Sequence, residues 1–156
     1  TNEINKLMIN LPKGALINGE LVEKNIGISK EYNIFELQNA LAERNVLKAN
    51  RIINYFSSNI KDNSIIGSVS VLYDFFMRVF IVHQMKQQPD KEVAAAIERP
   101  PFFLSVFKTA MRNYPVAKVL YVLSLLKEYD LKAKGVDSGS ISESDLYKEL
   151  VYKILH

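Results

Sequence analysis

The sequence predicts an all-α protein, a helical bundle of about six to seven helices preceded by two short helices. Apolar residues recur three and four positions apart along most of the chain, which is the period of one helix face. No stretch alternates polar and apolar residues for long enough to indicate a strand. With 48% hydrophobic and 24% charged residues, the composition is that of a globular protein. The longest strongly apolar run, residues 119–126, is much shorter than the roughly 20 residues of a membrane-spanning helix.

The opening residues predict the two short helices. In the first, which ends before Pro12, apolar residues repeat at three and four from the start, and the chain does not begin with Met. We therefore expect the sequence to be a piece of a longer protein that enters this helix part-way. The second short helix runs from a cap at Asn18 to a terminator at Gly27.

Two capped helices follow in the sequence. Asn33 is well placed as an N-cap, and Glu36 three residues later completes an approximate capping box. A second cap at Asn45 opens a helix that reaches about Ser58. Connections as short as these predict that successive helices are antiparallel neighbours.

Two longer helices, residues 64–87 and 116–134, are apolar around most of their circumference, and Gly135 ends the second. Such helices must be buried on more than one side. Either the other helices of this chain cover all of this surface, or another subunit buries part of it. A helix between the two is expected to place three phenylalanines in core positions: Phe102, Phe103 and Phe107.

The last helix begins after a loop rich in Ser and Gly. Ser142 and Asp145 form its capping box. Two tyrosines on different sides of this helix, Tyr147 and Tyr152, are candidate interface residues.

Residues that could carry chemistry are few and have plain structural explanations. The chain has no cysteine and two histidines, which excludes the common zinc sites. His83 lies on the apolar stripe of a long helix, which favours a hydrogen-bonded core histidine over a general base. Six glycines are scattered singly, so no phosphate-binding loop is predicted. We expect no catalytic site, no metal and no bound cofactor. Two carboxylate pairs are conceivable acid–base candidates, Glu92 with Glu98 and Asp130 with Asp137, but each lies among solvated charges, which favours an ordinary surface role.

The net charge of +3 keeps a second function class open. A small basic excess permits contact with nucleic acid, although the basic residues do not gather on one helix stripe. A helical nucleic-acid-binding domain, or a generic protein-interaction domain, is therefore the alternative to a specific assembly domain.

Several motifs carry a resemblance to a known family. In this chain they are Asn2, Glu3, Ile4, Lys6 and Leu7; Val22, Glu23 and Gly27; Phe35, Glu36, Leu37, Ala40 and Leu41; and Leu131, Lys132, Lys134 and Gly135. Together with the order of the helices, they resemble the carboxy-terminal part of the delta subunit of the bacterial DNA polymerase III clamp loader. The resemblance covers nearly the whole chain.

The resemblance implies two domains. Residues 1–31 would be the end of the helical lid of an AAA+ module, and residues 32–156 the collar domain. In that family the collars of five subunits form a ring, so the implied partners are the delta-prime and gamma/tau subunits of a bacterial, cytoplasmic complex, with no membrane. The sliding clamp is contacted through the amino-terminal module, which would precede this piece. The family's holoenzyme is a DNA-directed DNA polymerase, but this part is expected to have no catalytic site.

The resemblance also implies a joint between a fixed ring and a moving ATPase layer, where a few residues absorb a rotation. The candidate hinge residues are Gly27, Ser29, Lys30 and Glu31. Direct contact of the collar with DNA stays open. The basic side chains that would make such a contact are Lys127, Lys132 and Lys134.

Overall fold

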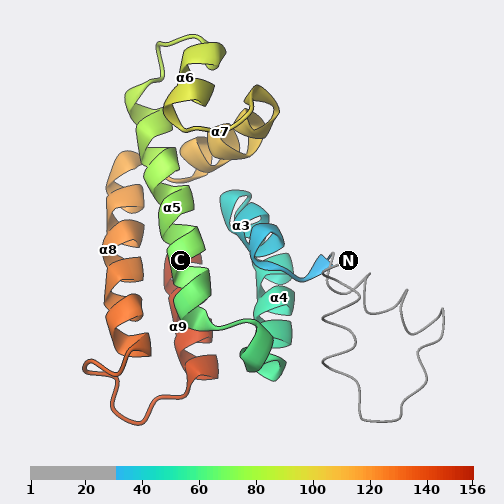
Figure 1. Cartoon of the computed structure of the whole chain (residues 1–156), viewed down its shortest axis with the longest axis vertical. Coiled ribbons are helices and arrows are strands. Elements are labelled where there is room, and N and C mark those ends of the chain that lie inside the picture. The colour runs from blue at the N-terminus through green and yellow to red at the C-terminus, as the bar shows by residue number, and fades with distance from the viewer. Residues whose placement is uncertain (1–30) are drawn as a thin grey trace, which may run out of the picture.

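The computed structural model describes residues 31–156, and this part of the chain is entirely helical, with no strand (Figure 1). The predicted all-α fold class is confirmed. The first predicted domain and three of the four hinge residues lie outside the described residues, and Glu31 at their edge is exposed. The helices are α3 (Ile34–Ala42), α4 (Val46–Ser58), α5 (Ile65–Gln84), α6 (Asp90–Ala96), α7 (Leu104–Asn113), α8 (Val116–Ala133) and α9 (Glu143–Leu155), with 3-10 turns η1 (Ile60–Asp62) and η2 (Pro101–Phe103).

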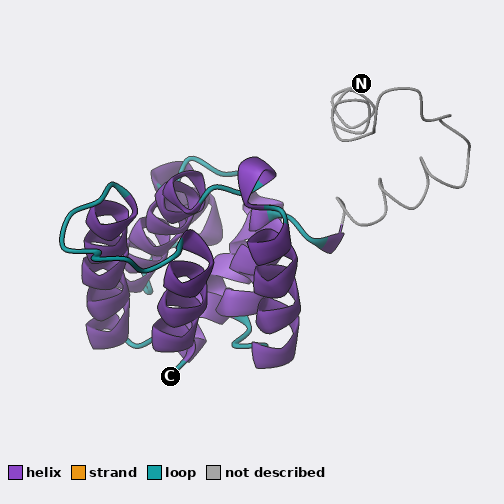
Figure 2. Ribbon diagram, turned by 90° about the horizontal axis from the view of Figure 1, so that it is seen from below, coloured by secondary structure: helices purple, strands orange, loops and turns teal. Residues whose placement is uncertain are grey.

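The long helices α5 and α8 form the spine of the bundle. They run antiparallel, and their shared surface is the most extensive between any two helices of the described part (Figure 1). Helix α9 packs against α4 and α8, while α3 and α7 close the remaining side of α5. The view along the bundle shows these helices around one interior (Figure 2). A single hydrophobic cluster, to which every α-helix from α3 to α9 contributes, fills that interior.

Helix α5 is the buried centre of this arrangement. By length and apolar composition alone, it is the one helix of residues 31–156 that would be able to cross a membrane. Its packing against α3, α7, α8 and α9 is that of a core helix. The apolar circumference seen in the sequence is therefore largely explained by contacts within the chain.

Three of the four predicted N-caps are confirmed, and the fourth, Asn18, lies outside the described residues. The side chain of Asn33 accepts hydrogen bonds from the backbone N–H groups of the second and third residues of α3, both at 3.0 Å. Asn45 accepts one from Lys48 at 3.1 Å, and Ser142 accepts one from Asp145 at 3.1 Å. Each bond satisfies a donor that the helix itself leaves without a partner.

Three helices end in the same way, with one residue in the left-handed region. Arg44 (φ 53°), Glu98 (φ 55°) and Gly135 (φ 95°) follow α3, α6 and α8. In each case the N–H of this residue and the N–H of the residue after it donate to carbonyls of the last helical turn, which is the Schellman arrangement. Only Gly135 was predicted, because glycine adopts this conformation without steric cost whereas arginine and glutamate do not.

Two predicted boundaries differ from the structure. The helix predicted over residues 64–87 ends at Gln84, where the N–H of Met85 bonds to the carbonyls of both Ile81 and Val82 and tightens the last turn. The α-helix that was expected to include Phe102 and Phe103 begins at Leu104. The residue before a proline is kept out of the α region, so Pro100 stays extended (ψ 147°) and the chain enters α7 through the 3-10 turn that begins at Pro101.

Candidate protein-interaction site

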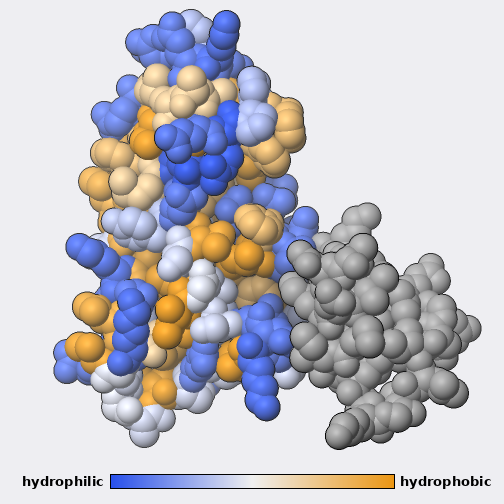
Figure 3. All heavy atoms as spheres, viewed as in Figure 1, coloured by the Kyte–Doolittle hydropathy of each residue, from blue (hydrophilic) through white to orange (hydrophobic). Residues whose placement is uncertain are grey.

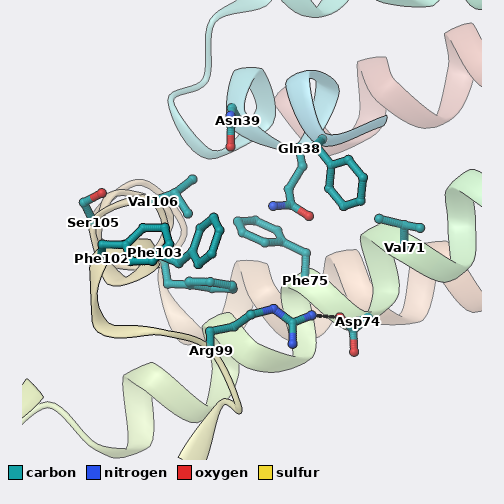
Figure 4. A pocket seen from close by; sticks show the side chains of 12 residues that line it. Gln38, Asn39, Val71, Asp74, Phe75, Arg99, Phe102, Phe103, Ser105 and Val106 are labelled. Atoms are coloured by element: carbon teal, nitrogen blue, oxygen red, sulfur yellow. Dashed lines mark hydrogen bonds and ion pairs between the residues drawn. The ribbon is translucent and has the colours of Figure 1, made fainter. Parts of the chain in front are cut away.

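Three phenylalanines stand at the surface where a core would be expected. Phe35 is 62% exposed, Phe102 75% and Phe103 45%. They lie around one hollow of about 630 Å³ between α3, α5 and α7 (Figure 4). In the space-filling view, apolar atoms lie at the outer side of the connection between α6 and α7 and again beside α5, with hydrophilic atoms between the two areas (Figure 3). Exposed apolar side chains are common singly, but a contiguous group around a hollow is typical of an interaction site.

Below these rings is a buried aromatic floor. Phe75 from α5 and Phe107 from α7 are almost fully buried, and their ring centroids lie 5.0 Å apart. Val71 and Val106 complete the walls. We call the hollow, its rim of Phe35, Phe102 and Phe103 and this floor the phenylalanine groove.

Local sequence explains why the rim faces outward. In α3, Phe35 and Leu37 are two positions apart, so they point to nearly opposite sides of the helix, and Leu37 takes the core. Phe102 and Phe103 follow Pro100 and Pro101, whose fixed φ angles hold the turn away from the bundle. The rings of Phe102 and Phe103 contact each other at 4.3 Å between centroids.

The charged side chains of the phenylalanine groove lie at one end. Asp74 on α5 forms ion pairs with two guanidinium groups, those of Arg78 and Arg99. Arg78 is largely covered, and its Nε donates to the carbonyl of Ile97 at 2.6 Å. Arg99 reaches Asp74 at 3.3 Å and lies beside the phenylalanine rings (Figure 4).

The predicted family-like motif is divided between core and surface. Leu37, Ala40 and Leu41 are fully buried in the bundle. Glu36 forms an ion pair of 2.7 Å with Lys48, which ties α3 to the start of α4. Phe35 is the member of the motif that belongs to the groove.

The prediction that Tyr147 is an interface residue is wrong. Tyr147 is 1% exposed, and its hydroxyl donates to the carbonyl of Asn63 at 2.7 Å and contacts the Ser68 hydroxyl at 2.5 Å. Burial raises the pKa of Tyr147 to about 12. Its polar group is satisfied inside the bundle, so it offers nothing to a partner. Tyr152 is 63% exposed and packs on His156, and its role in an interface stays a prediction.

Phe102 and Phe103 were assigned to the core from helical spacing, and the structure corrects this. Periodicity identifies an apolar stripe but not whether another element covers it. The sequence did contain a signal, because two consecutive prolines directly before the phenylalanines indicate that the first turn is displaced from the helix axis. Leu120 and Tyr121 on α8 are further large apolar side chains left at the surface.

The candidate catalytic residues do not line the phenylalanine groove. His83 is buried, and its Nε2–H donates to the carbonyl of Tyr114 at 2.7 Å, as a hydrogen-bonded core histidine would. Glu92 and Glu98 are exposed on and after α6. In residues 31–156, no group of three His, Cys, Asp or Glu side chains is placed to hold a metal ion.

The lysines considered for DNA contact lie at the end of α8 among acidic neighbours. Lys132 pairs with Glu128 at 2.7 Å, and Lys134 pairs with Asp130 at 2.8 Å. Lys127 is exposed and lines a second hollow, smaller than the phenylalanine groove. Asp130 and Lys134 line the same hollow. The positive charges of Lys132 and Lys134 are therefore locally compensated.

Comparisons of the chain with protein families, with curated proteins and with solved structures give no match.

Proposed function

We propose that this chain is an assembly domain, of the collar type, from the delta subunit of a bacterial DNA polymerase III clamp loader. Its work would be to bury apolar surface against the delta-prime and gamma/tau subunits and so help the complex load the sliding clamp on primed DNA. The sliding clamp itself would be held by an amino-terminal module outside this sequence, and no step of catalysis is assigned to this part.

The observation that carries the proposal is the phenylalanine groove. After every helix of the described part has packed, three phenylalanine rings remain at the surface around one hollow. Leaving such rings in water is unfavourable by about 1.5–3 kcal/mol per fully exposed side chain, and burial against another protein recovers this. The order of the helices and the motif around Phe35 support the choice of family.

Charge argues for a protein partner over nucleic acid. Among the sixteen Lys and Arg residues of the described part, seven form ion pairs with acidic side chains. The side chains of Arg44 and Lys118 instead donate hydrogen bonds to backbone carbonyls at the end of α9. A nucleic-acid-binding face needs cations that neutralise phosphates. The alternative, a nucleic-acid-binding domain, is supported by the net charge of +3 alone.

The test is reconstitution. The chain is mixed with purified delta-prime and gamma or tau subunits, and the mass of the complex is measured by light scattering at low and high salt. We expect a complex whose affinity changes little with salt, because the interface is apolar. If the chain associates with none of these subunits, the proposal is refuted. Binding to an oligonucleotide that weakens steeply with salt would favour the alternative.

A further inference from the structure

We propose that the phenylalanine groove receives an amphipathic helix from a neighbouring protein, and that this helix carries a carboxylate next to its apolar face. The inference rests on the proposed function, because it names the partner segment that the exposed surface would bury.

The rim of the phenylalanine groove is prepared for binding before a partner arrives. Phe102 and Phe103 are held by prolines and by mutual stacking, and Phe35 sits on a capped helix. Few rotamers are therefore lost when a partner covers them, which lowers the entropic cost of association. Clusters of large aromatic side chains around a pocket are the usual location of binding hot spots.

The chemistry of the walls selects a helix as the occupant. Seven of the twelve lining residues are phenylalanine or valine, which offer no hydrogen bond to a peptide backbone, and five are polar: Gln38, Asn39, Asp74, Arg99 and Ser105. An extended or polyproline segment would leave its carbonyls without partners over the apolar part of the lining, whereas a helix satisfies its own backbone. A groove between two helices that takes the apolar face of a third is a recurrent mode of recognition.

The charged side chains at the end of the phenylalanine groove favour a negative charge on the partner. Two guanidinium groups share the single carboxylate of Asp74, which leaves one positive charge without a counterpart within this triad. Arg78 is 15% exposed and fixed by a backbone carbonyl, while Arg99 is 38% exposed at the mouth. A carboxylate on the partner would meet Arg99, whereas a lysine at that position would meet like charge.

The experiment uses a synthetic amphipathic helical peptide of about 16 residues, a length at which isolated helices begin to form. Its apolar face carries Phe and Leu, and Glu residues flank that face. A second peptide has Lys at each Glu position, and a third is rich in proline. Binding to the full chain is measured by calorimetry, and the contacted residues are mapped by NMR chemical shifts.

We expect the acidic peptide to bind and to shift residues of the phenylalanine groove. Phe102→Ala should weaken binding about 30-fold, the loss typical of a hot-spot side chain. Arg99→Ala should weaken it about two- to fivefold, and Arg99→Glu should reverse the preference toward the lysine peptide. Leu120→Ala is the matched control, an exposed leucine on α8 away from the groove, and should change nothing. All three positions are exposed or half-exposed, and circular dichroism verifies the fold of each of the four variants.

Three results would overturn the inference: no binding of the acidic peptide, equal or tighter binding of the lysine peptide, or binding of the proline-rich peptide that depends on Phe102. Subunit mixing separates this inference from the proposed function. If Phe102→Ala and Arg99→Glu assemble with the loader subunits as well as the unchanged chain does, the groove is not the docking site although assembly stands. If the unchanged chain does not assemble, the proposed function itself fails.

Discussion

Replacing Tyr147 by phenylalanine tests whether this side chain is a buried structural element. The change removes one hydroxyl and leaves the ring in place, with its centroid 5.8 Å from that of Phe56. The carbonyl of Asn63 and the hydroxyl of Ser68 then lose their partner in a part of the bundle where Ser68 is 6% exposed. The perturbation is therefore confined to hydrogen bonding.

The magnitude follows from these two contacts. A buried hydrogen bond contributes about 1 kcal/mol net, and leaving a polar group unsatisfied costs about 1–3 kcal/mol. We expect Tyr147→Phe to lower the free energy of unfolding by about 2–3 kcal/mol, which corresponds to a drop in Tm of roughly 5–10 °C. Urea titration followed by circular dichroism measures the first quantity, and a thermal scan the second.

A double-mutant cycle separates the two partners. Ser68→Ala together with Tyr147→Phe removes the orphaned hydroxyl, so the double variant should lose about 1 kcal/mol less than the sum of the single variants. Additive losses would show that the two hydroxyls do not interact. A loss below about 0.5 kcal/mol for Tyr147→Phe would refute the reasoning, because it is the size of an ordinary surface change.

Three further predictions concern helix ends and the acid range. Glu98→Gly should stabilise the protein by about 0.5–1 kcal/mol in urea titrations, because glycine removes the strain of the left-handed conformation; an unchanged midpoint would contradict this. Arg44→Gly gains the same relief but loses a charged hydrogen bond to the end of α9, so a net loss of about 1 kcal/mol is expected, and a net gain would show that this bond contributes nothing. Hydrogen bonds from Tyr129 and Lys153 hold the pKa of Glu149 below its usual value, so its contribution to stability is present above the unfolded pKa and is lost as the pH falls through the folded one. Glu149→Gln should flatten the acid side of a stability–pH curve; a curve with the same slope would exclude Glu149 as its source.

Features that depend on neighbours in sequence could be predicted, and features that depend on what covers a residue could not. Asn33, Asn45 and Ser142 were found because a cap is made within four residues of the chain. The left-handed conformations of Arg44 and Glu98 were not predicted, because neither arginine nor glutamate favours a positive φ. At both positions the conformation accompanies the hydrogen bonds that end the helix.

The candidate site shows the same division. The apolar character of Phe102 was plain, but its exposure depends on the absence of an element over η2, which helical spacing does not reveal. The prediction for Tyr147 failed for the opposite reason, because its position on the last helix did not reveal that its hydroxyl has partners at Asn63, directly after η1, and at Ser68 in α5. Residues far apart in sequence supply those partners.

The guanidinium of Arg44 joins distant parts of the chain, since it donates to the carbonyl of Leu155 at 2.5 Å across 111 positions. Helix α4 likewise packs on α9, which follows it far along the chain, as well as on its neighbour α3. During synthesis the part of α4 that α9 covers would therefore stay uncovered until the 13 residues of α9 leave the ribosome. A chain halted before α9 would expose this apolar surface of α4 to water.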